Sequence, residues 1–460
     1  MGKINKANMK KTLYYLKRNG LKNTWYAVRE RLDEKRNAPY SFTPITEEEW
    51  EVQRRDAEKY ETLFSIVVPA YRTAKQYLQE LIDSVTNQSY PRWELIIADA
   101  TEDDSVENFV KEYTRDERIR YVRLQENAGI AENTNQGLAV AKGDYIGLLD
   151  HDDVLTENAL YEMAVAIEKG KQAGVEVRML YSDEDKCNGD RTQYYEPNFK
   201  EDFNLDLLLS NNYICHFLVM DSALMKELGF RQEYNGAQDY DLVLRAAERL
   251  LEKDEQIAHI PLVLYHWRCH AASTAENPQS KQYAYDAGMR ALQNFADRLG
   301  WNARAIPLKH LGFYTLLYKG GPLKDRKDIG AVGGRLVAGA GAKTVGGRMS
   351  ETGEVYYKGL PMAYSGYLHR ASLTQNAEAL DIRCIQVKEE LYDLFKEVTN
   401  VSYKKMENYD LFDASVLPEG TDYTALSLKL SKAIRERGYR LLYLPTRIEE
   451  WDAKKHKLKR

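Results

Sequence analysis

The sequence predicts an α/β protein: a parallel, doubly wound sheet of the Rossmann-like type, preceded by a helical arm and followed by a smaller α/β unit. Three observations predict it. From residue 64 onward, short apolar runs alternate with segments of helical periodicity, which is the pattern of βα units. Two of the apolar runs end in carboxylates, as strands that reach a ligand-binding edge do. Finally, part of this region recurs near the end of the chain.

Length and composition narrow the class of protein. A chain of 460 residues allows two to four domains with apolar cores. A net charge of −5 gives no signature of nucleic-acid binding, which would require a basic face. No apolar run approaches the roughly 18 residues of a membrane span, and the start of the chain lacks a signal-peptide core. The cysteines are too widely spaced for a zinc site or a disulfide framework and fit a reducing cytoplasm: Cys187, Cys215, Cys269 and Cys384.

The first 62 residues are expected to form a basic helical arm and a linker. In residues 1–36, eleven Lys and Arg stand against three acidic residues, and apolar residues recur at helical spacing on both sides of Gly20. This pattern predicts two short amphipathic helices with a basic face. Such an arm either lies on an anionic membrane surface or packs on the main body, and both interpretations stay open. Residues 37–62 are predicted to be a polar, acidic linker.

Residues 63–300 are expected to form the main domain. Buried strands are predicted at residues 64–71, 93–99, 119–124 and 145–149. Helices are predicted between them, at residues 78–87, 106–113 and 130–141. Strands separated by helices at this spacing run parallel, so their carboxyl ends should share one edge. Further on, the sequence predicts a strand at 213–220, a helix at 238–251 and a strand at 257–267 that ends at His266.

The most informative motif follows the fourth strand. Directly after Leu149 come Asp150, His151, Asp152 and Asp153. Clustered carboxylates at a strand end suit a hard divalent cation that bridges the protein to a phosphate. The alternative is that the acidic run only caps the helix that begins near Thr156. Three carboxylates in four positions after a buried strand favour the metal and phosphate interpretation.

A late segment repeats the back half of the main domain. Asp239-Tyr240, a helix and a strand ending in His266 recur as Asp422-Tyr423, a helix and a strand ending in Glu450-Trp451. Residues 329–460 are therefore predicted to be a degenerate half-copy with a basic tail, joined by a linker at residues 301–328. The half-copy lacks counterparts of Asp99 and Asp150, and coincidence between two αβ units is the alternative.

Together these motifs resemble family 2 glycosyltransferases, which are inverting enzymes with the GT-A fold. They are most similar to bacterial cell-envelope polysaccharide enzymes of the rhamnosyltransferase type. The matching segments, in the family's order between residues 64 and 268, are IVVPAY, WELIIAD, NAGIAENTNQGLAVAKGDYIGLLDHDDVL, YSDEDK, SNNYICH, GAQDYDLVLR and PLVLYHWR. The resemblance implies a GT-A (Rossmann-like) nucleotide-sugar-binding domain. It also implies transfer of a sugar from a UDP- or dTDP-sugar to a hydroxyl of a growing, lipid-linked glycan. The enzyme would lie in the cytoplasm, peripheral to the inner face of the plasma membrane.

The resemblance also assigns the reacting groups. A Mn²⁺ or Mg²⁺ ion held by Asp152 and His266 would offset the charge of the diphosphate leaving group. Asp150 would contact the ribose or a metal-bound water. A general base takes the acceptor proton in an inverting reaction, and the family's position for it is Asp239. Asp241 is the competitor, because residues two apart at a helix start point to different faces and only one can face the donor.

The nucleotide pocket follows from the same resemblance. Its residues would be Pro69, Tyr71, Asp99, Asn127 and Asn135, together with Asp150. Asp183, Glu184 and Asp185 would face the donor sugar or the acceptor, or else form an exposed acidic turn. Three positions depart from the family's usual residues and leave the choice between UDP and dTDP open: Arg72, Ala100 and Thr134.

Two other classes remain as alternatives. One is a non-catalytic scaffold with a degenerate sugar-nucleotide fold, and the other is a sugar-nucleotide nucleotidyltransferase. A nucleotidyltransferase should carry a Gly-rich phosphate loop after the first strand, where this chain has Pro69 to Arg72. Since residues 64–268 keep both the metal and the base positions, the sequence favours the glycosyltransferase.

Overall fold

Four parallel strands that form one half of a large sheet confirm the first half of the prediction. They are β1 (Phe64–Ala70), β2 (Trp93–Asp99), β3 (Ile119–Arg123) and β4 (Tyr145–Leu148). Both β2 and β4 pair with β1 in parallel, and β3 pairs with β2. All seven residues of β2 are buried, because helices cover both faces of this part of the sheet. This explains the unbroken apolar runs in the sequence.

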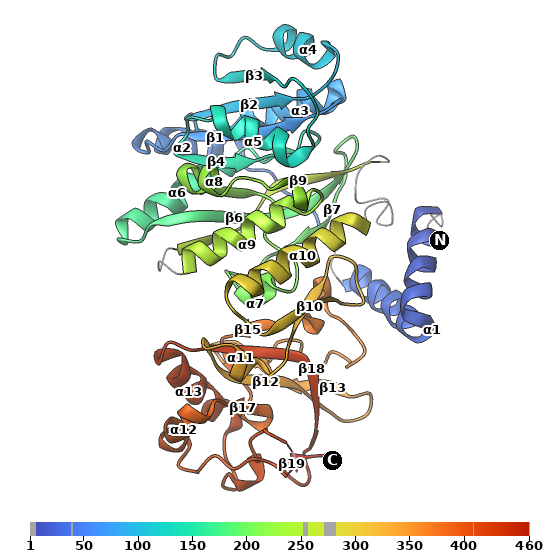
Figure 1. Cartoon of the computed structure of the whole chain (residues 1–460), viewed down its shortest axis with the longest axis vertical. Helices are drawn as coiled ribbons and strands as arrows, with labels where there is room; N and C mark the ends of the chain where they lie inside the picture. The colour runs from blue at the N-terminus through green and yellow to red at the C-terminus, as the bar shows by residue number, and fades with distance from the viewer. Residues whose placement is uncertain (1–5, 38–39, 252–255, 271–281, 408, 460) are drawn as a thin grey trace. The chain divides into compact units, whose positions relative to one another are not determined.

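The computed structural model describes residues 6–37, 40–251, 256–270, 282–407 and 409–459. The chain divides into two units (Figure 1). We call Pro39–Phe203 with Asn212–Phe295 the large-sheet unit. We call Met1–Ala38, Asn204–Asn211 and Ala296–Arg460 the arm unit. No helix among these described residues is long and apolar enough to cross a membrane.

The sheet of the large-sheet unit has the strand order β3-β2-β1-β4-β8-β6-β9-β5. Its second half is mixed: β8 (Leu218–Asp221) is antiparallel to β4 and β6, whereas β9 (Gln256–Cys269) is parallel to β6 (Val177–Asn188). The short β5 (Val154–Leu155) pairs with the end of β9, and β7 (Tyr194–Asn198) pairs with β6. From β1 the chain first adds β2 and β3 on one side of the sheet and then places β4 on the other side of β1. At such a switch point in strand order, a ligand crevice forms at the carboxyl ends of the strands.

Amphipathic helices flank this sheet. α3 (Lys75–Thr86) buries Leu78, Leu81, Ile82 and Val85, one stripe at helical spacing. The other helices of the unit are α4 (Ser105–Tyr113), α5 (Ile130–Val140), α6 (Ala159–Gln172), α8 (Ser222–Leu228), α9 (Gln238–Leu251) and most of α10 (Gln282–Arg298). These elements place the acidic motif directly after β4 and Asp239 in the first turn of α9.

The segment predicted as an acidic linker is partly helical. α2 (Glu47–Asp56) begins with a capping box, in which Thr46 and Glu49 satisfy each other's backbone N–H groups. Trp50 Nε1 donates to the carbonyl of Asn87 and fixes the helix on the unit. The linker prediction is wrong here because the Thr-x-x-Glu signal outweighs the polar composition.

The arm unit begins with α1 (Lys6–Asn37), which bends at Gly20, where φ is 77° and ψ is 170°. Gly20 has non-helical backbone angles and separates the two helical stretches of α1. The unit also holds a sheet of order β13-β12-β18-β15, with β12 (Ile329–Ala338) parallel to β18 (Arg440–Asp452). Beside them lie β13 (Lys343–Gly346), β15 (Gln375–Ala377), α12 (Tyr392–Thr399) and α13 (Tyr423–Glu436).

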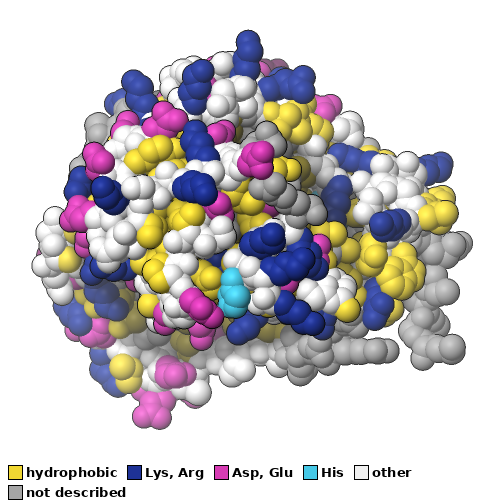
Figure 2. All heavy atoms as spheres, turned by 90° about the horizontal axis from the view of Figure 1, so that it is seen from below, with side chains coloured by type: hydrophobic (Ala, Val, Ile, Leu, Met, Phe, Trp, Pro, Cys, Tyr) yellow, Lys and Arg dark blue, Asp and Glu magenta, His cyan; other side chains and the backbone are white. Residues whose placement is uncertain are grey.

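The predicted helix and strand of the half-copy are therefore present as α13 and β18. The segment 301–328, expected to be a linker, instead forms a hairpin of β10 (Ala303–Pro307) and β11 (Tyr314–Tyr318), followed by the short α11 (Pro322–Asp325). Lys and Arg side chains stand next to Asp and Glu side chains over the face seen in Figure 2, so no single-sign charge covers it.

Candidate functional site

The acidic motif forms a tight turn between β4 and β5. Asp153 is fully buried in it, and both of its oxygens accept hydrogen bonds: Oδ1 from the backbone N–H of Arg268 at 2.7 Å and Oδ2 from the Tyr265 hydroxyl at 2.5 Å. Burial, followed by the neighbouring carboxylates, raises the pKa of Asp153 well above its usual value. Asp153 therefore anchors the turn, whereas Asp150 and Asp152 are half-buried and available to a ligand.

The side chain of Arg268 stabilises the acidic turn through hydrogen bonds. Its guanidinium is completely buried and donates to the carbonyls of Asp152 and Gly189 and to the Glu80 carboxylate, at 2.5, 2.7 and 2.6 Å. It also lies 4.6 Å over the Tyr77 ring. One side chain thus joins α3, the β6–β7 turn and the acidic turn. The sequence analysis assigned no role to Arg268.

His216 lies beside Asp150, and the sequence analysis did not single it out. Its Nε2 is 3.8 Å from Asp150 Oδ2, and its Nδ1 is 3.1 Å from Glu184 Oε2. The ring stacks on Tyr265 with centroids 4.6 Å apart and planes 10° from parallel. An imidazole oriented by a carboxylate on one nitrogen presents the other nitrogen in a fixed direction. Among the described residues, Asp150, Asp153 and His216 are the group whose ligand atoms lie within 4.8 Å of one another.

Glu184 is held by a buried positive charge. Lys200 has no exposed side-chain surface, and its Nζ lies 3.6 Å from Glu184 and donates to the carbonyl of Ile214 at 2.6 Å. Burial alone would raise the pKa of Glu184, but the charges of Lys200 and His216 outweigh it and lower that pKa to about 2. Glu184 therefore stays ionised and fixes His216.

The predicted ligand His266 lies elsewhere. Its Nδ1 is 2.5 Å from Asp185 Oδ1, and its ring packs against Phe42 and Tyr194 at 4.4 and 4.5 Å. Its backbone pairs with Val154, directly after the acidic turn, but its ring contacts Asp185, whereas His270 Nε2 lies 2.8 Å from Asp152 Oδ2. The reason is that β9 continues past His266 to Cys269, so the residue at the strand end is His270.

Asp239 and Asp241 have different surroundings, as the helix geometry predicted. Asp239 Oδ2 accepts a hydrogen bond from Asn212 Nδ2 at 2.8 Å and lies 3.5 Å from the Cys215 thiol. The same sulfur lies 3.5 Å from His216 Nε2. A continuous set of contacts thus joins Asp150, His216, Cys215 and Asp239. The charge of Asp239 also reaches Asp150, where it adds to burial and Asp152 in raising the pKa.

Asp241 is part of the scaffold. Its side chain is 2% exposed and is bound by two guanidinium groups, those of Arg231 and Arg245. Nε of each arginine donates to Asp241 Oδ2 at 2.9 Å. These contacts leave Asp241 no access to a substrate.

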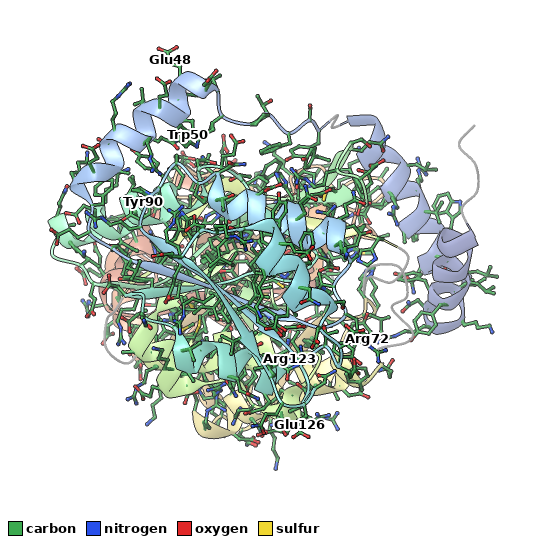
Figure 3. All side chains as sticks on the ribbon, turned by 90° about the horizontal axis from the view of Figure 1, so that it is seen from above. Glu48, Trp50, Arg72, Tyr90, Arg123 and Glu126 are labelled. Carbon is green, nitrogen blue, oxygen red and sulfur yellow. The ribbon has the colours of Figure 1, made fainter. Side chains whose placement is uncertain are left out.

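Pro69, Tyr71 and Asp99 come together at the carboxyl ends of β1 and β2, where Pro69 faces Ala98 and Ala70 faces Asp99 in the register. Asp99 is fully buried and accepts from Thr101 Oγ1 at 2.6 Å and from the Tyr121 hydroxyl at 2.8 Å. The Tyr71 hydroxyl donates to Glu102 at 2.8 Å. Arg72 forms two hydrogen bonds with the same carboxylate. In Figure 3, Arg72 and Arg123 lie on the side of Glu126, away from Trp50 and Tyr90.

The two predicted asparagines stabilise loops. Asn135 donates to the carbonyl of Phe230 at 2.9 Å and accepts from its N–H at 2.8 Å, so both ends of its amide are occupied. Asn127 Oδ1 accepts from Gly129 and Asn133. In this structure Asn135 ties α5 to the segment after α8, which differs from the nucleotide contact that the sequence predicted.

The acidic run Asp183 to Asp185 is not an exposed turn. All three residues are buried in β6. Asp183 Oδ1 lies 2.9 Å from His259 Nε2, and Asp185 pairs with His266. Only Glu184 reaches the acidic turn, through His216.

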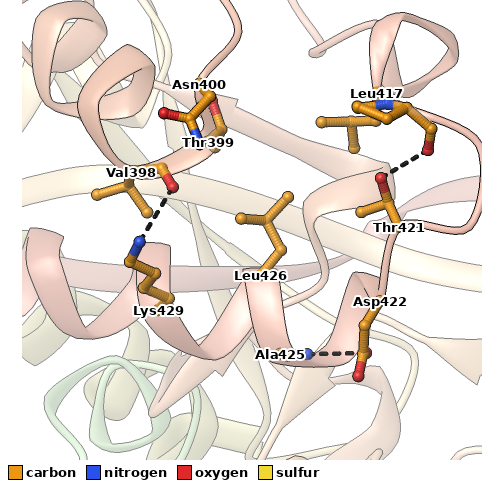
Figure 4. Close-up of a pocket in the computed structure, with 10 residues that line it drawn as sticks. Val398, Thr399, Asn400, Leu417, Thr421, Asp422, Ala425, Leu426 and Lys429 are labelled. Carbon is orange, nitrogen blue, oxygen red and sulfur yellow. Dashed lines mark hydrogen bonds between the residues drawn. The ribbon is translucent and has the colours of Figure 1, made fainter.

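A cavity of about 360 Å³ lies elsewhere, in the arm unit between α12 and α13 (Figure 4). Its two charged groups are engaged: Lys429 Nζ contacts the carbonyl of Val398 at 3.5 Å, and Asp422 caps α13 through the N–H groups of Thr424 and Ala425. It offers a diphosphate neither paired carboxylates for a metal nor a free cation.

Comparisons with known proteins show which family this chain is similar to. A family model described as "Glycosyl transferase family 2" matches residues 65–229. The uncharacterized protein y4gI of Sinorhizobium fredii is 41% identical over 249 residues, 54% of this chain and 26% of that protein. The O-antigen biosynthesis protein RfbC of Myxococcus xanthus is 34% identical over 282 residues, 58% of this chain and 21% of that protein. The chain thus spans about a quarter of the length of these two relatives.

Another relative is matched over most of its length. The putative colanic acid biosynthesis glycosyl transferase WcaA of Escherichia coli is 30% identical over 214 residues, 44% of this chain and 74% of that protein. Among solved structures, Staphylococcus aureus TarS 1-349 in complex with UDP-GlcNAc is similar with a TM-score of 0.41 and 20% identity, over 51% of this chain and 66% of that one. The α/β sheet with its acidic turn is the GT-A fold, and the chain belongs to glycosyl transferase family 2.

Proposed function

We propose that this glycosyltransferase moves a sugar, with inversion, from a UDP- or dTDP-sugar to a hydroxyl of a growing, lipid-linked cell-envelope glycan. The observation that carries the proposal is the set of contacts from Asp150 through His216 and Cys215 to Asp239. These contacts support the proposal, because Asp150, which would hold a metal for the donor phosphates, and Asp239, which would take the acceptor proton, belong to one connected group.

The groups around the acidic turn fit a divalent metal. Asp150 with His216, and Asp152 with His270, form two carboxylate–imidazole pairs at the turn, and the ligand atoms of Asp150, Asp153 and His216 lie within 4.8 Å of one another. Such a mixed set of oxygen and imidazole donors fits Mn²⁺, and the carboxylates alone fit Mg²⁺. Bound there, the ion would offset the charge of the diphosphate as the glycosidic bond breaks. Buried Arg268 and Asp153 would keep the turn from shifting during that step.

Asp239 is well arranged to act as the base. Asn212 and Cys215 both contact Oδ2, and no described donor contacts Oδ1. Oδ1 can therefore take the proton of the acceptor hydroxyl while that oxygen attacks the anomeric carbon opposite the diphosphate. This single displacement inverts the anomeric configuration. Asn212 orients the base without touching the substrate.

Tyr71 is proposed to stack on the pyrimidine, and the fully buried Asp99 to hold the end of β2 beside it. Tyr121 and Thr101 orient the Asp99 carboxylate, and Tyr71 presents a ring at the end of β1. The names of two relatives, one in O-antigen and one in colanic acid biosynthesis, support an envelope glycan as the acceptor class. We therefore place the enzyme at the cytoplasmic face of the membrane, as a peripheral protein.

The experiment is a binding and transfer panel with UDP-, dTDP- and GDP-sugars, with and without Mn²⁺. Metal-dependent binding of a pyrimidine nucleotide is expected. Asp152→Ala and His270→Ala should weaken it, whereas His266→Ala, whose ring lies against Asp185, is the matched control and should not. Loss of binding in His266→Ala alone, or full activity without metal, would contradict the proposed site.

A further inference from the structure

The second half of α1 is held on the arm unit by one face. Glu30 is buried, and its carboxylate accepts hydrogen bonds from the backbone N–H groups of Ser365 and Gly366 at 3.1 and 2.6 Å. Tyr26 packs edge-on against Tyr364 with centroids 6.4 Å apart. In the first half of the helix, Arg18 and Asn19 donate to the carbonyls of Leu308 and Lys309. The arm is therefore docked on the body of its own unit.

On the opposite face of the same helix, four large apolar side chains are exposed. Leu21, Trp25, Val28 and Leu32 are 80%, 55%, 46% and 54% exposed. After the bend at Gly20 they follow one another at intervals of four, three and four residues, which is one stripe at about 100° per residue. A continuous stripe of large apolar side chains in water marks an interaction site, unlike the singly scattered ones found on any surface.

Cations border this stripe. With about 100° between successive residues of the helix, Lys22 and Arg29 lie along one edge of the apolar stripe and Arg31 lies along the other edge. All three side chains are exposed. Glu30 is the one acidic residue between positions 21 and 32, and it is turned into the body. An apolar stripe between two cationic edges is complementary to an anionic lipid surface. It is not complementary to itself, because a second copy packed along the stripe would bring the cations together.

We propose that the stripe of Leu21, Trp25, Val28 and Leu32, with its flanking cations, is the surface by which this protein lies on an anionic membrane. The inference deepens the proposed function, on which it rests for its setting at the cytoplasmic face. The two interpretations of the arm are compatible: one face packs on the body and the other binds lipid. The helix α1 would then bind the membrane while it stays packed on the body of its unit.

The experiment is vesicle co-flotation of the full chain, with phosphatidylcholine vesicles and with vesicles that also contain phosphatidylserine. The test variant is Leu21→Ser with Leu32→Ser. The matched control is Leu317→Ser with Ile448→Ser, which removes two other exposed apolar side chains, 47% and 42% exposed, from the same unit. Trp25 stays in place as a reporter, and Trp25→Phe identifies its share of the fluorescence. Thermal unfolding confirms that every variant is folded.

Flotation should require phosphatidylserine, fall about tenfold in the test variant and remain unchanged in the control. Trp25 emission should shift to shorter wavelength on the anionic vesicles, and high salt should reverse both effects. Equal flotation of test and control variants would overturn the proposal. So would a dimer in solution that only the test variant dissociates, because the stripe would then bind a second copy. Sugar-nucleotide turnover with a soluble acceptor is measured in parallel, so a failed catalytic proposal is distinguished from a failed membrane contact.

Discussion

Replacing Asp241 with asparagine should destabilise the large-sheet unit, whereas the same change at Asp239 should leave its stability nearly intact. The two carboxylates are two residues apart at the start of α9, yet only Asp241 is buried between Arg231 and Arg245. Asparagine keeps the shape of the side chain and removes its charge. Arg245, 11% exposed, would then lose its ion pair with Asp241 in a buried place.

The expected loss of unfolding free energy in Asp241→Asn follows from how exposed Arg231 and Arg245 are. Breaking a buried ion pair costs about 3–5 kcal/mol. Arg231 is 32% exposed and can turn to water, and Arg245 keeps its hydrogen bonds to the carbonyls of Leu228 and Gly229, so we expect about 2–4 kcal/mol. For a unit of this size that corresponds to a fall in Tm of roughly 5–15 °C. Asp239→Asn should change the stability by less than about 1 kcal/mol.

The assay is differential scanning calorimetry of the full chain, with sugar transfer measured at a temperature where every variant is folded. Under that condition Asp241→Asn should retain transfer within a few-fold, because its carboxylate does not face the site. An unchanged Tm in Asp241→Asn together with lost transfer would refute the reasoning and make Asp241 the base.

Three further predictions concern other groups. First, the rings of His310 and His369 stack with centroids 3.5 Å apart, beside Tyr15 of α1. Burial lowers the pKa of His310 to about 2 and that of His369 to about 4, and positive neighbours including Lys309 add to the effect. Both stay neutral when folded and protonate near pH 6.5 when released, so this part of the arm's stability is complete above pH 6.5 and is lost as the pH falls toward 4. Proteolysis of α1 should accelerate over that window, and less so in His310→Phe with His369→Phe; an equal acceleration would exclude the histidines as the cause. Second, Asn212→Ala should lower kcat about 10²-fold with little change in the KM for the donor, and the isosteric Asn212→Asp should be worse because it repels Asp239. Asn108→Ala, an exposed change on α4, is the control, and a kcat for Asn212→Asp close to that of the parent would count against the role. Third, Asp99→Ala with Asp150→Ala should remove all nucleotide binding in calorimetry, because among the described residues the cluster of metal-ligating side chains is Asp150, Asp153 and His216, outside the arm unit; residual binding would reveal a second site.

The sequence was sufficient for the elements whose pattern is local. The apolar runs of β1 to β4 and the carboxylates that follow β4 predicted both the parallel strands and the acidic turn. Helical geometry alone predicted that the side chains of Asp239 and Asp241 would point to different faces of the helix. The capping box of Thr46 and Glu49 is also a local signal, and it predicts the start of α2 within a segment of polar composition.

Other parts of the site depend on pairing between distant strands. Glu184 and Tyr265 are register partners in β6 and β9, and His216 lies beside them because β8, which begins at Leu218, pairs with β6. Sequence periodicity does not give that register, nor the number of residues by which β9 extends beyond His266. For the same reason the pattern pointed to His266, while the strand end presents His270 to Asp152.

The most direct test of the central claim compares the parent protein with Asp239→Asn, using the sugar nucleotide that binds best and an envelope-type acceptor. Calorimetry establishes donor binding in both proteins, and the anomeric configuration of the product is read by NMR. We predict an inverted product, unchanged donor binding in the variant and a loss of transfer of about 10³-fold. A retained anomeric configuration, or transfer by Asp239→Asn at the parent rate, would contradict the assignment of Asp239 as the base of an inverting glycosyltransferase.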